Sequence, residues 1–418
     1  VGVVGSLFIV TMATSITFLT GLSVAAIATD QRVRIGGAYY MISRSLGIES
    51  GGAIGIPLYI ALALSVALYV VGFAESVVGV FPHLEVHWVG VITTIAVTVL
   101  AMISAKVAIR TQYVIMVAIA ISLISLIFGS PVESTATAQQ LSDLPPKEPF
   151  WAVFAVFFPA VTGIMAGVNM SGDLKNPTKS IPVGTFAAIG TGYLIYMGLV
   201  IILYTRATPY ELISDPLIMR KISFWGDAIL LGVWGATLSS AVGSILGGPR
   251  VLQALAKDKI LPGWLSWLGK GSGADDEPRY GTFFTMIVAL IAVWFGDLNL
   301  IAPVLTMFFL TTYGVINLAA GIEKLLDSPS YRPIFKVHWS VSITGAIGCF
   351  SVMFLINLTA TLVALLFVGV IFIWLERREL TSVWGNVKSG LLMAVIRESL
   401  LKVSDDYEPK TWRPQPLV

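Results

Sequence analysis

The chain has 418 residues, of which 56% are hydrophobic and only 12% are charged. Together with a mean hydropathy of +0.85, this composition predicts an all-helical polytopic membrane protein and excludes a soluble globular domain. The net charge is +2 and there is no basic tract, which argues against nucleic acid as a partner. The expected environment is the lipid bilayer.

Apolar stretches long enough to cross a bilayer as helices follow one another along most of the chain. There are eleven, at residues 3–28, 52–78, 88–105, 111–131, 151–170, 183–205, 225–247, 281–296, 298–321, 340–357 and 359–375. Lys and Arg outside these stretches number 22 on one side and 4 on the other. By the positive-inside rule, the first side and the C-terminus are predicted to be cytoplasmic.

Three polar segments stand out on the predicted cytoplasmic side. The connections at 32–40 and 171–182 are rich in glycine or turn-forming residues. Each is interpreted either as a gate over the cytoplasmic access path or as an ordinary loop. After Leu375 the chain becomes polar, and an amphipathic helix is predicted at 390–403.

The fifth apolar stretch is interrupted at its centre by proline, threonine and glycine. Because Pro159 lacks a backbone donor and Gly163 tolerates non-helical dihedral angles, the helix is expected to open between Phe158 and Gly163. Discontinuous spans of this kind are typical of substrate sites in transporters. The alternative is a simple proline kink in a structural helix.

The position of this broken stretch bears on the fold. Inverted-repeat transporters contain two halves of five spans, and each half opens with a broken helix. Here four stretches precede the broken one and four follow it up to residue 321. The count predicts an inverted five-helix repeat with two extra C-terminal helices, in which the first transmembrane helix is missing ahead of Val1.

The interiors of the stretches carry no Lys, Arg, Asp or Glu, and only Glu75 and Asp227 lie close to span ends. A carrier for a proton or a cation alone usually keeps a carboxylate in the membrane. Any ion bound here must instead be balanced by another ion. At an effective dielectric constant near 20, a cation and an anion ~5 Å apart attract by ~3 kcal/mol, which couples their binding by roughly a hundredfold.

The broken stretch supplies groups for both signs of charge. Carbonyls freed around Pro159 suit a cation, the Thr162 hydroxyl adds a neutral oxygen, and the free amides that begin at Gly163 suit an anion. Other polar side chains within stretches are Tyr69, Tyr313 and the pair Ser239 and Ser240. The alternatives for these residues are interhelical hydrogen bonding by the tyrosines and close helix packing by the serines.

Long strings along nearly the whole chain are specific in combination: TGLSVAAIATD, GGAYYMISRSLG, ALYVVGFAES, FFPAVTGIMAGVNMSGDLKNPTKSIP, ATLSSAVGS, GGPRVLQALAKDKILP, NLIAPVLTMFFLTTYGVIN, SPSYRPIF and WRPQPLV. On these strings the sequence resembles the cation-chloride cotransporters of the amino acid-polyamine-organocation superfamily, and most closely the sodium-potassium-chloride type.

The resemblance implies ion ligands residue by residue. They are Tyr69, Pro159 and Thr162 for potassium, Gly163, Ile164, Met165 and Tyr313 for chloride, and Ala236, Ser239 and Ser240 for sodium. The resemblance implies that potassium is bound through the Pro159 carbonyl, and chloride through backbone amides and the Tyr313 hydroxyl. Because potassium-chloride members of the family lack the serine pair, its presence favours sodium coupling.

The implied function is electroneutral symport of chloride with potassium and sodium by alternating access, in the plasma membrane and without a cofactor. Residues 1–375 would form the transport domain, and residues 376–418 would form the beginning of a truncated cytoplasmic domain. The family uses this domain for dimerisation, so the resemblance is compatible with a homodimer. The sequence departs from the family in lacking its first helix and in the short connection at 206–224.

Other functions remain open. A potassium-chloride cotransporter without sodium coupling and an amino acid permease of the same superfamily share the architecture, whereas a non-transporting membrane scaffold or regulatory fragment belongs to another class. An enzyme is not expected, since the sequence contains no nucleophile with a base, no transition-metal cluster and no phosphate-binding loop.

Overall fold

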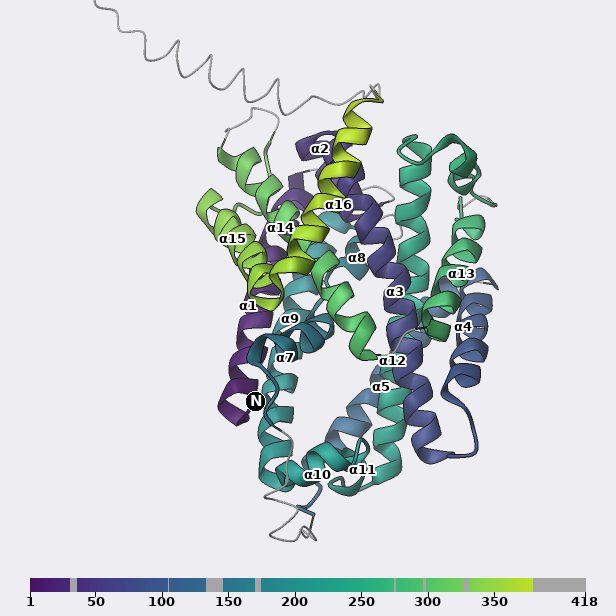
Figure 1. Ribbon diagram of the computed structural model, residues 1–418, viewed down its shortest axis with the longest axis vertical. Helices are drawn as coiled ribbons and strands as arrows, with labels where there is room; N and C mark the ends of the chain where they lie inside the picture. Colours follow the sequence, from purple (N-terminus) through teal and green to yellow (C-terminus); the bar gives the residue numbers. More distant parts are fainter. Residues whose placement is uncertain are drawn as a thin grey trace, which may run out of the picture.

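The computed structural model describes residues 1–30, 36–103, 105–132, 146–169, 174–273, 276–295, 298–325 and 331–378. Its regular elements in these ranges are helices, apart from a single bridge between Ser272 and Glu277. One end of the molecule carries α2 (Ala38–Leu46) and the end of α16 (Leu358–Glu376), and the other end carries α10 (Pro209–Ser214) and α11 (Ile218–Lys221) (Figure 1). The predicted helix at 390–403 lies outside the described residues.

The described helices account for the eleven predicted stretches. Nine are long and apolar enough to cross a membrane: α1 (Val3–Asp30), α3 (Ile48–Val80), α4 (Val86–Ile103), α5 (Ala105–Ile127), α9 (Pro177–Arg206), α12 (Gly226–Lys257), α14 (Leu298–Leu325), α15 (Trp339–Ile356) and α16. Two shorter apolar segments, α13 (Arg279–Phe295) and the broken one at Phe150–Val161, complete the set. The prediction of an all-helical membrane protein is confirmed.

Several helices extend beyond the apolar stretches, and two predicted connections are partly helical. α12 continues ten residues past residue 247 and ends at Lys257, so its basic last turn lies beyond the predicted apolar stretch. The loop predicted at 171–182 is wrong in its second half, since α9 begins at Pro177; proline is tolerated in a first turn, where the backbone donor has no helical partner. The connection at 32–40 likewise leads into α2, which begins at Ala38.

Small residues bring α12 close to its neighbours. α12 packs extensively against α3 and α5. A side chain on Gly232 would come within 2.3 Å of Ser122 on α5, and one on Gly248 would come within 3.3 Å of Leu62 on α3. Small residues that allow backbones to approach are typical of helix contacts in membranes. The positions of α3 and α5 relative to α12 are fixed by these close contacts.

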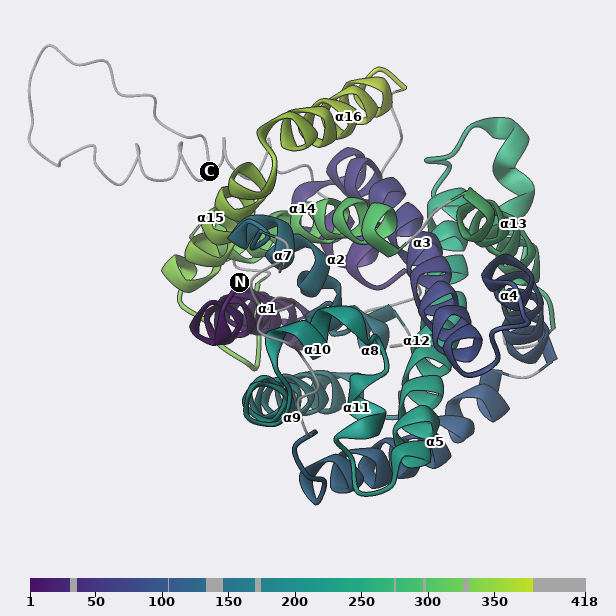
Figure 2. The same cartoon turned by 60° about the horizontal axis from the view of Figure 1, so that its bottom comes forward.

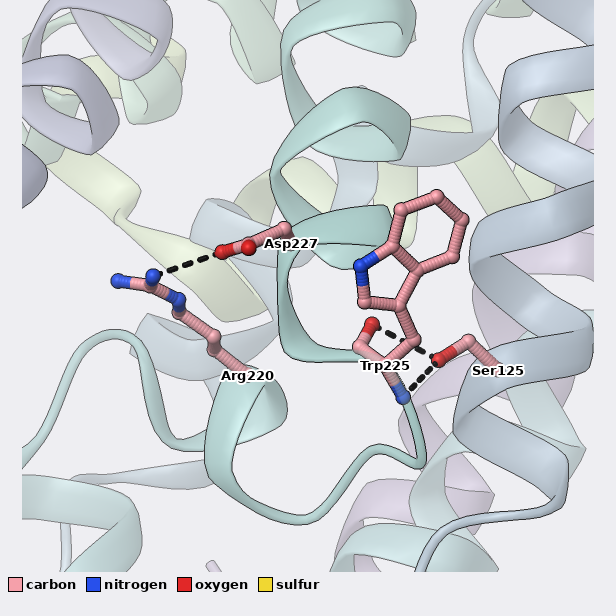
Figure 3. A network of polar contacts seen from close by, with 4 residues as sticks. All are labelled: Ser125, Arg220, Trp225 and Asp227. Atoms are coloured by element: carbon pink, nitrogen blue, oxygen red, sulfur yellow. Dashed lines mark hydrogen bonds and ion pairs between the residues drawn. The ribbon is translucent and has the colours of Figure 1, made fainter.

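Hydrogen bonds fix the start of α12 to the end of α5 (Figure 3). The Ser125 hydroxyl accepts from the Trp225 amide at 2.8 Å and donates to the Trp225 carbonyl at 2.9 Å. Arg220 of α11 pairs with Asp227 in the first turn of α12 at 2.7 Å. The rotational setting of α12 relative to α5 is therefore defined at this end of the bundle.

The helices fall into two groups with the broken segment between them (Figure 2). α1, α9 and α15 lie on one side, and α3, α4 and α13 on the other. Between the groups lie α7 (Phe150–Phe157) and α8 (Met165–Asn169). α7 packs against α1, α14 and α15, whereas α8 packs against α9 and α12.

Candidate functional site

The fifth apolar stretch is a broken helix. α7 ends at Phe157, a 3-10 turn, η1, covers Phe158–Val161, and α8 begins only at Met165. A kink in a continuous helix is therefore excluded. The break begins where Pro159 removes a backbone donor and ends just after Gly163, as the sequence predicted.

Four consecutive carbonyls at the break each lie within hydrogen-bond distance of a hydroxyl group. The Thr162 hydroxyl donates to Pro159 at 2.8 Å and the Tyr313 hydroxyl donates to the Thr162 carbonyl at 2.5 Å. Tyr196 on α9 donates to Ala160 at 3.0 Å, and Thr17 on α1 lies 3.2 Å from the Val161 carbonyl. Non-helical backbone at membrane depth needs such partners, so side chains from three helices support the opening.

A cavity of about 380 Å³ lies beside the break. It is lined by α3, α5, α12, the broken segment and Phe309 of α14. Its lining residues are Leu62, Ser65, Tyr69, Gln112, Thr162, Gly163, Met165, Ala166, Gly167, Asn169, Ser239, Ser240, Gly243, Ser244, Leu246 and Phe309. None of these described lining residues carries a charge, so the polar groups of the cavity are neutral oxygens, amides and hydroxyls.

The cavity brings together residues predicted for all three ions. Six of the ten predicted ligands line it: Tyr69, Thr162, Gly163, Met165, Ser239 and Ser240. Pro159, Ile164, Ala236 and Tyr313 do not. Pro159 and Tyr313 are buried directly behind it and are joined to Thr162 by hydrogen bonds. Ala236 lies one helical turn before the serine pair on α12.

The backbone at the break is accessible from the cavity. A side chain at Gly163 or Gly167 would meet nothing within 4 Å. Among the hydrogen bonds found outside regular helices in the described ranges, none is donated by the amides of Gly163, Ile164 or Met165. These donors are thus suited to a small anion in the cavity.

Tyr313 is engaged in a different contact from the predicted one. Its side chain is fully buried, and its only hydroxyl hydrogen is donated to the Thr162 carbonyl. An anion would therefore have to displace that carbonyl in order to receive a hydrogen bond from Tyr313. The same exchange would release a carbonyl oxygen beside the predicted potassium ligands.

Gln112 on α5 is a cavity residue that sequence reasoning missed. The Ser239 hydroxyl donates to Gln112 Oε1, and Gln112 Nε2 donates to the Ser239 carbonyl at 3.3 Å. Because the hydroxyl hydrogen points towards Gln112, the lone pairs of the Ser239 oxygen are left for a cation. The available signal was a glutamine inside the predicted stretch at 111–131, close to the charged residue Arg110.

Comparison with known proteins identifies the family. The family model described as amino acid permease matches residues 1–395. The chain belongs to the amino acid permease family. This permease-family chain is 34% identical over 476 residues to solute carrier family 12 member 2 of Homo sapiens, a match that covers 99% of the chain and 39% of that relative. It is 32% identical over 474 residues to solute carrier family 12 member 1 of Mus musculus, covering 98% of the chain and 43% of the relative.

The permease-family chain spans about two fifths of the length of the curated relatives it matches. The similarity to solute carrier family 12 confirms the resemblance to cation-chloride cotransporters. Because the matches are transporters, the transporter fold and the expectation of a transport protein rather than an enzyme are also confirmed. The protein is an integral membrane protein. The individual ion ligands stay predictions.

Proposed function

We propose that the full-length protein carries chloride together with potassium and sodium across the plasma membrane by electroneutral symport. The observation that supports this most is a cavity whose described lining residues are all uncharged and include residues predicted for each of the three ions. In a cavity whose described lining has no charge, a cation and an anion neutralise each other. Residues 1–375 form the transport domain in this proposal, and the tail from residue 376 lies in the cytoplasm, where it is compatible with a homodimer.

The potassium ligands in this proposal are Tyr69, the Pro159 carbonyl and the Thr162 hydroxyl. Thr162 already donates its hydrogen to Pro159 at 2.8 Å, so its oxygen presents lone pairs to the cavity. Chloride is held by the amides of the residues from Gly163 to Met165 and by Tyr313. The ions lie on opposite sides of one short break in the backbone, which explains how each favours binding of the other.

Sodium is held in this proposal by the Ala236 carbonyl and by the hydroxyls of Ser239 and Ser240. Gln112 is the positioning residue of this site, because it accepts the hydrogen of Ser239 and also binds the Ser239 carbonyl. A cation needs oxygen lone pairs rather than hydroxyl hydrogens. Replacement of Gln112 should therefore weaken sodium dependence without removing any ligand.

The first test measures uptake of radioactive rubidium by cells that express the full-length protein. Tyr69→Phe should raise the half-saturating rubidium concentration about tenfold, since one oxygen ligand of a cation is lost. Tyr204→Phe is the matched control, because Tyr204 lies on the exposed outer face of α9. Equal rubidium dependence in Tyr69→Phe and the unmodified protein would contradict the potassium assignment.

The second test addresses sodium. Joint replacement of Ser239 and Ser240 by alanine should abolish the sodium dependence of chloride-coupled rubidium uptake. Ser15→Ala is the matched control, since Ser15 is an exposed serine on α1. A sodium response that survives the double replacement would favour a potassium-chloride cotransporter, and uptake of an amino acid without chloride would favour an amino acid carrier.

A further inference from the structure

A second set of polar side chains lines the same cavity one helical turn away from the predicted ligands. Ser65 lies four residues before Tyr69 on α3, Ser244 lies four residues after Ser240 on α12, and Asn169 lies at the end of α8. Residues four apart on a helix share a face and are separated by about 6 Å along the axis. The three side chains therefore form a second polar level in the cavity.

All three side chains are displaced towards the same end of the bundle, the end that carries α2. α3 begins directly after α2, and α12 ends where Asp258 accepts a 2.5 Å hydrogen bond from Tyr39 of α2. Asn169 lies against Gly37, the residue before α2. The charge distribution of the sequence predicts that this end faces the cytoplasm.

Asn169 has polar atoms without partners. Its side chain is 1% exposed, and within the described part of the chain neither Oδ1 nor Nδ2 has a hydrogen-bond partner. Gly37 on one side and Gly247 on the other leave space for the amide, since a side chain on Gly37 would collide with Asn169 Oδ1. A buried amide without partners costs about 1–3 kcal/mol, so this group is suited to a partner that enters the cavity.

The hydrogen bond of Ser65 indicates which kind of ion fits. The Ser65 side chain is 2% exposed, and its hydroxyl donates its hydrogen to the Ala61 carbonyl at 2.8 Å. The Ser65 oxygen therefore offers only lone pairs, which suit a cation and not an anion. The absence of a carboxylate among these three side chains disfavours a divalent cation, which binds through charged oxygens.

We propose that Ser65, Asn169 and Ser244 form an additional binding site for an alkali cation, occupied as the cation passes between the predicted ligands and the cytoplasm. This proposal rests on the proposed function. Two cations about 6 Å apart at an effective dielectric constant near 20 repel each other strongly enough to disfavour joint occupancy. The second site therefore accepts a cation as the first is vacated.

Vesicles of known sidedness containing the full-length protein test the proposal by rubidium flux in each direction. Asn169→Leu keeps the shape of the side chain and removes its oxygen. It should raise the half-saturating rubidium concentration about tenfold from the cytoplasmic side and less than about twofold from the external side. Gln253→Leu is the matched control, because Gln253 is another fully buried amide with an unpaired oxygen but does not line the cavity.

The proposal would be overturned if the half-saturating rubidium concentration changed equally on both sides or did not change. A change in the half-saturating chloride concentration instead of the rubidium value would also overturn it. The joint variant Ser65→Ala with Ser244→Ala should show the same asymmetry and serves if Asn169→Leu fails to fold.

An independent measurement uses crystals of the full-length protein soaked in rubidium chloride. In crystals of Tyr69→Phe, whose predicted potassium site is weakened, an anomalous-scattering peak among the oxygens of Ser65, Asn169 and Ser244 would support the site, and its absence would overturn it. Loss of this peak in Asn169→Leu is also expected. The crystal measurement does not depend on transport. If the unmodified protein showed no chloride-dependent rubidium flux, the proposed function would be contradicted, but the anomalous peak would still test whether a cation binds at Ser65, Asn169 and Ser244.

Discussion

Two buried asparagines in this protein have opposite surroundings. Asn317 on α14 is fully buried between α1 and α15; it accepts from Ser23 at 2.7 Å and donates to Thr20 at 2.9 Å. Asn169 on α8 is equally buried, but its amide lacks partners among the described residues and lines the cavity. The same side chain is thus satisfied by the protein at one position and left unpaired at the other.

Buried polar residues have two different roles in this bundle. A satisfied buried network holds neighbouring helices together, and Ser23 extends this one to Ser342 on α15 at 2.9 Å. A buried group without a protein partner lowers stability, so its place beside a cavity indicates a role in binding. Identical substitutions at the two asparagines therefore separate stability from ion passage.

The largest effect on stability is expected for Asn317→Leu. This change breaks the hydrogen bonds to Ser23 and Thr20 and leaves the two hydroxyl groups without their asparagine partner. We expect a loss of about 2 kcal/mol in the free energy of unfolding. Thermal unfolding of the purified protein in detergent measures it, and an unchanged transition would show that the network contributes nothing.

Tyr313→Phe should have a smaller effect on stability. It removes the hydroxyl that donates to the Thr162 carbonyl and leaves that carbonyl without this partner, at a cost of about 1 kcal/mol. The half-saturating chloride concentration should also rise, because the proposed anion site loses a donor. Tyr204→Phe, on an exposed face of α9, should change neither quantity. A stability loss without any change in chloride dependence would confine Tyr313 to a structural role.

The sequence predicted the helices and the break, because both depend on neighbouring residues. Apolar length identified the eleven stretches, and Pro159 with Gly163 located the opening. It did not predict the partners of Asn317 or Gln112, since Ser23 and Asn317 are 294 positions apart and Gln112 and Ser239 are 127 apart. Stretches that are apolar on all sides give no indication of which face meets which neighbour.

A paired carboxylate near the surface extends the comparison. Asp215 accepts hydrogen bonds from Lys221 Nζ at 2.6 Å and from the Leu217 amide at 2.9 Å. Partial burial acts to raise the pKa of Asp215, but these hydrogen bonds and the lysine charge outweigh it and hold the pKa below its ordinary value of 3.8. A lowered folded-state pKa gives stability that is present above 3.8 and lost as the pH falls through the folded-state pKa.

Asp215→Asn should therefore lower the unfolding temperature slightly at pH near 6, and the difference from the unmodified protein should vanish in strong acid. Asparagine keeps an oxygen for the Leu217 amide, so the variant isolates the ion pair with Lys221. Unfolding scans at several pH values measure this. A difference that persists in acid would mean that the loss has a cause other than charge.

The smallest effect on stability is expected for Asn169→Leu. The same change from asparagine to leucine at residue 317 breaks the hydrogen-bond network described above. No protein hydrogen bond is lost within the described ranges, because neither polar atom of Asn169 has a partner there. The free energy of unfolding should change by less than about 0.5 kcal/mol or rise, since a buried unpaired amide is replaced by an apolar group of the same shape. Thermal unfolding beside Asn317→Leu measures the contrast directly. A loss as large as that of Asn317→Leu would mean that Asn169 serves the fold, and the distinction between the two asparagines would fail.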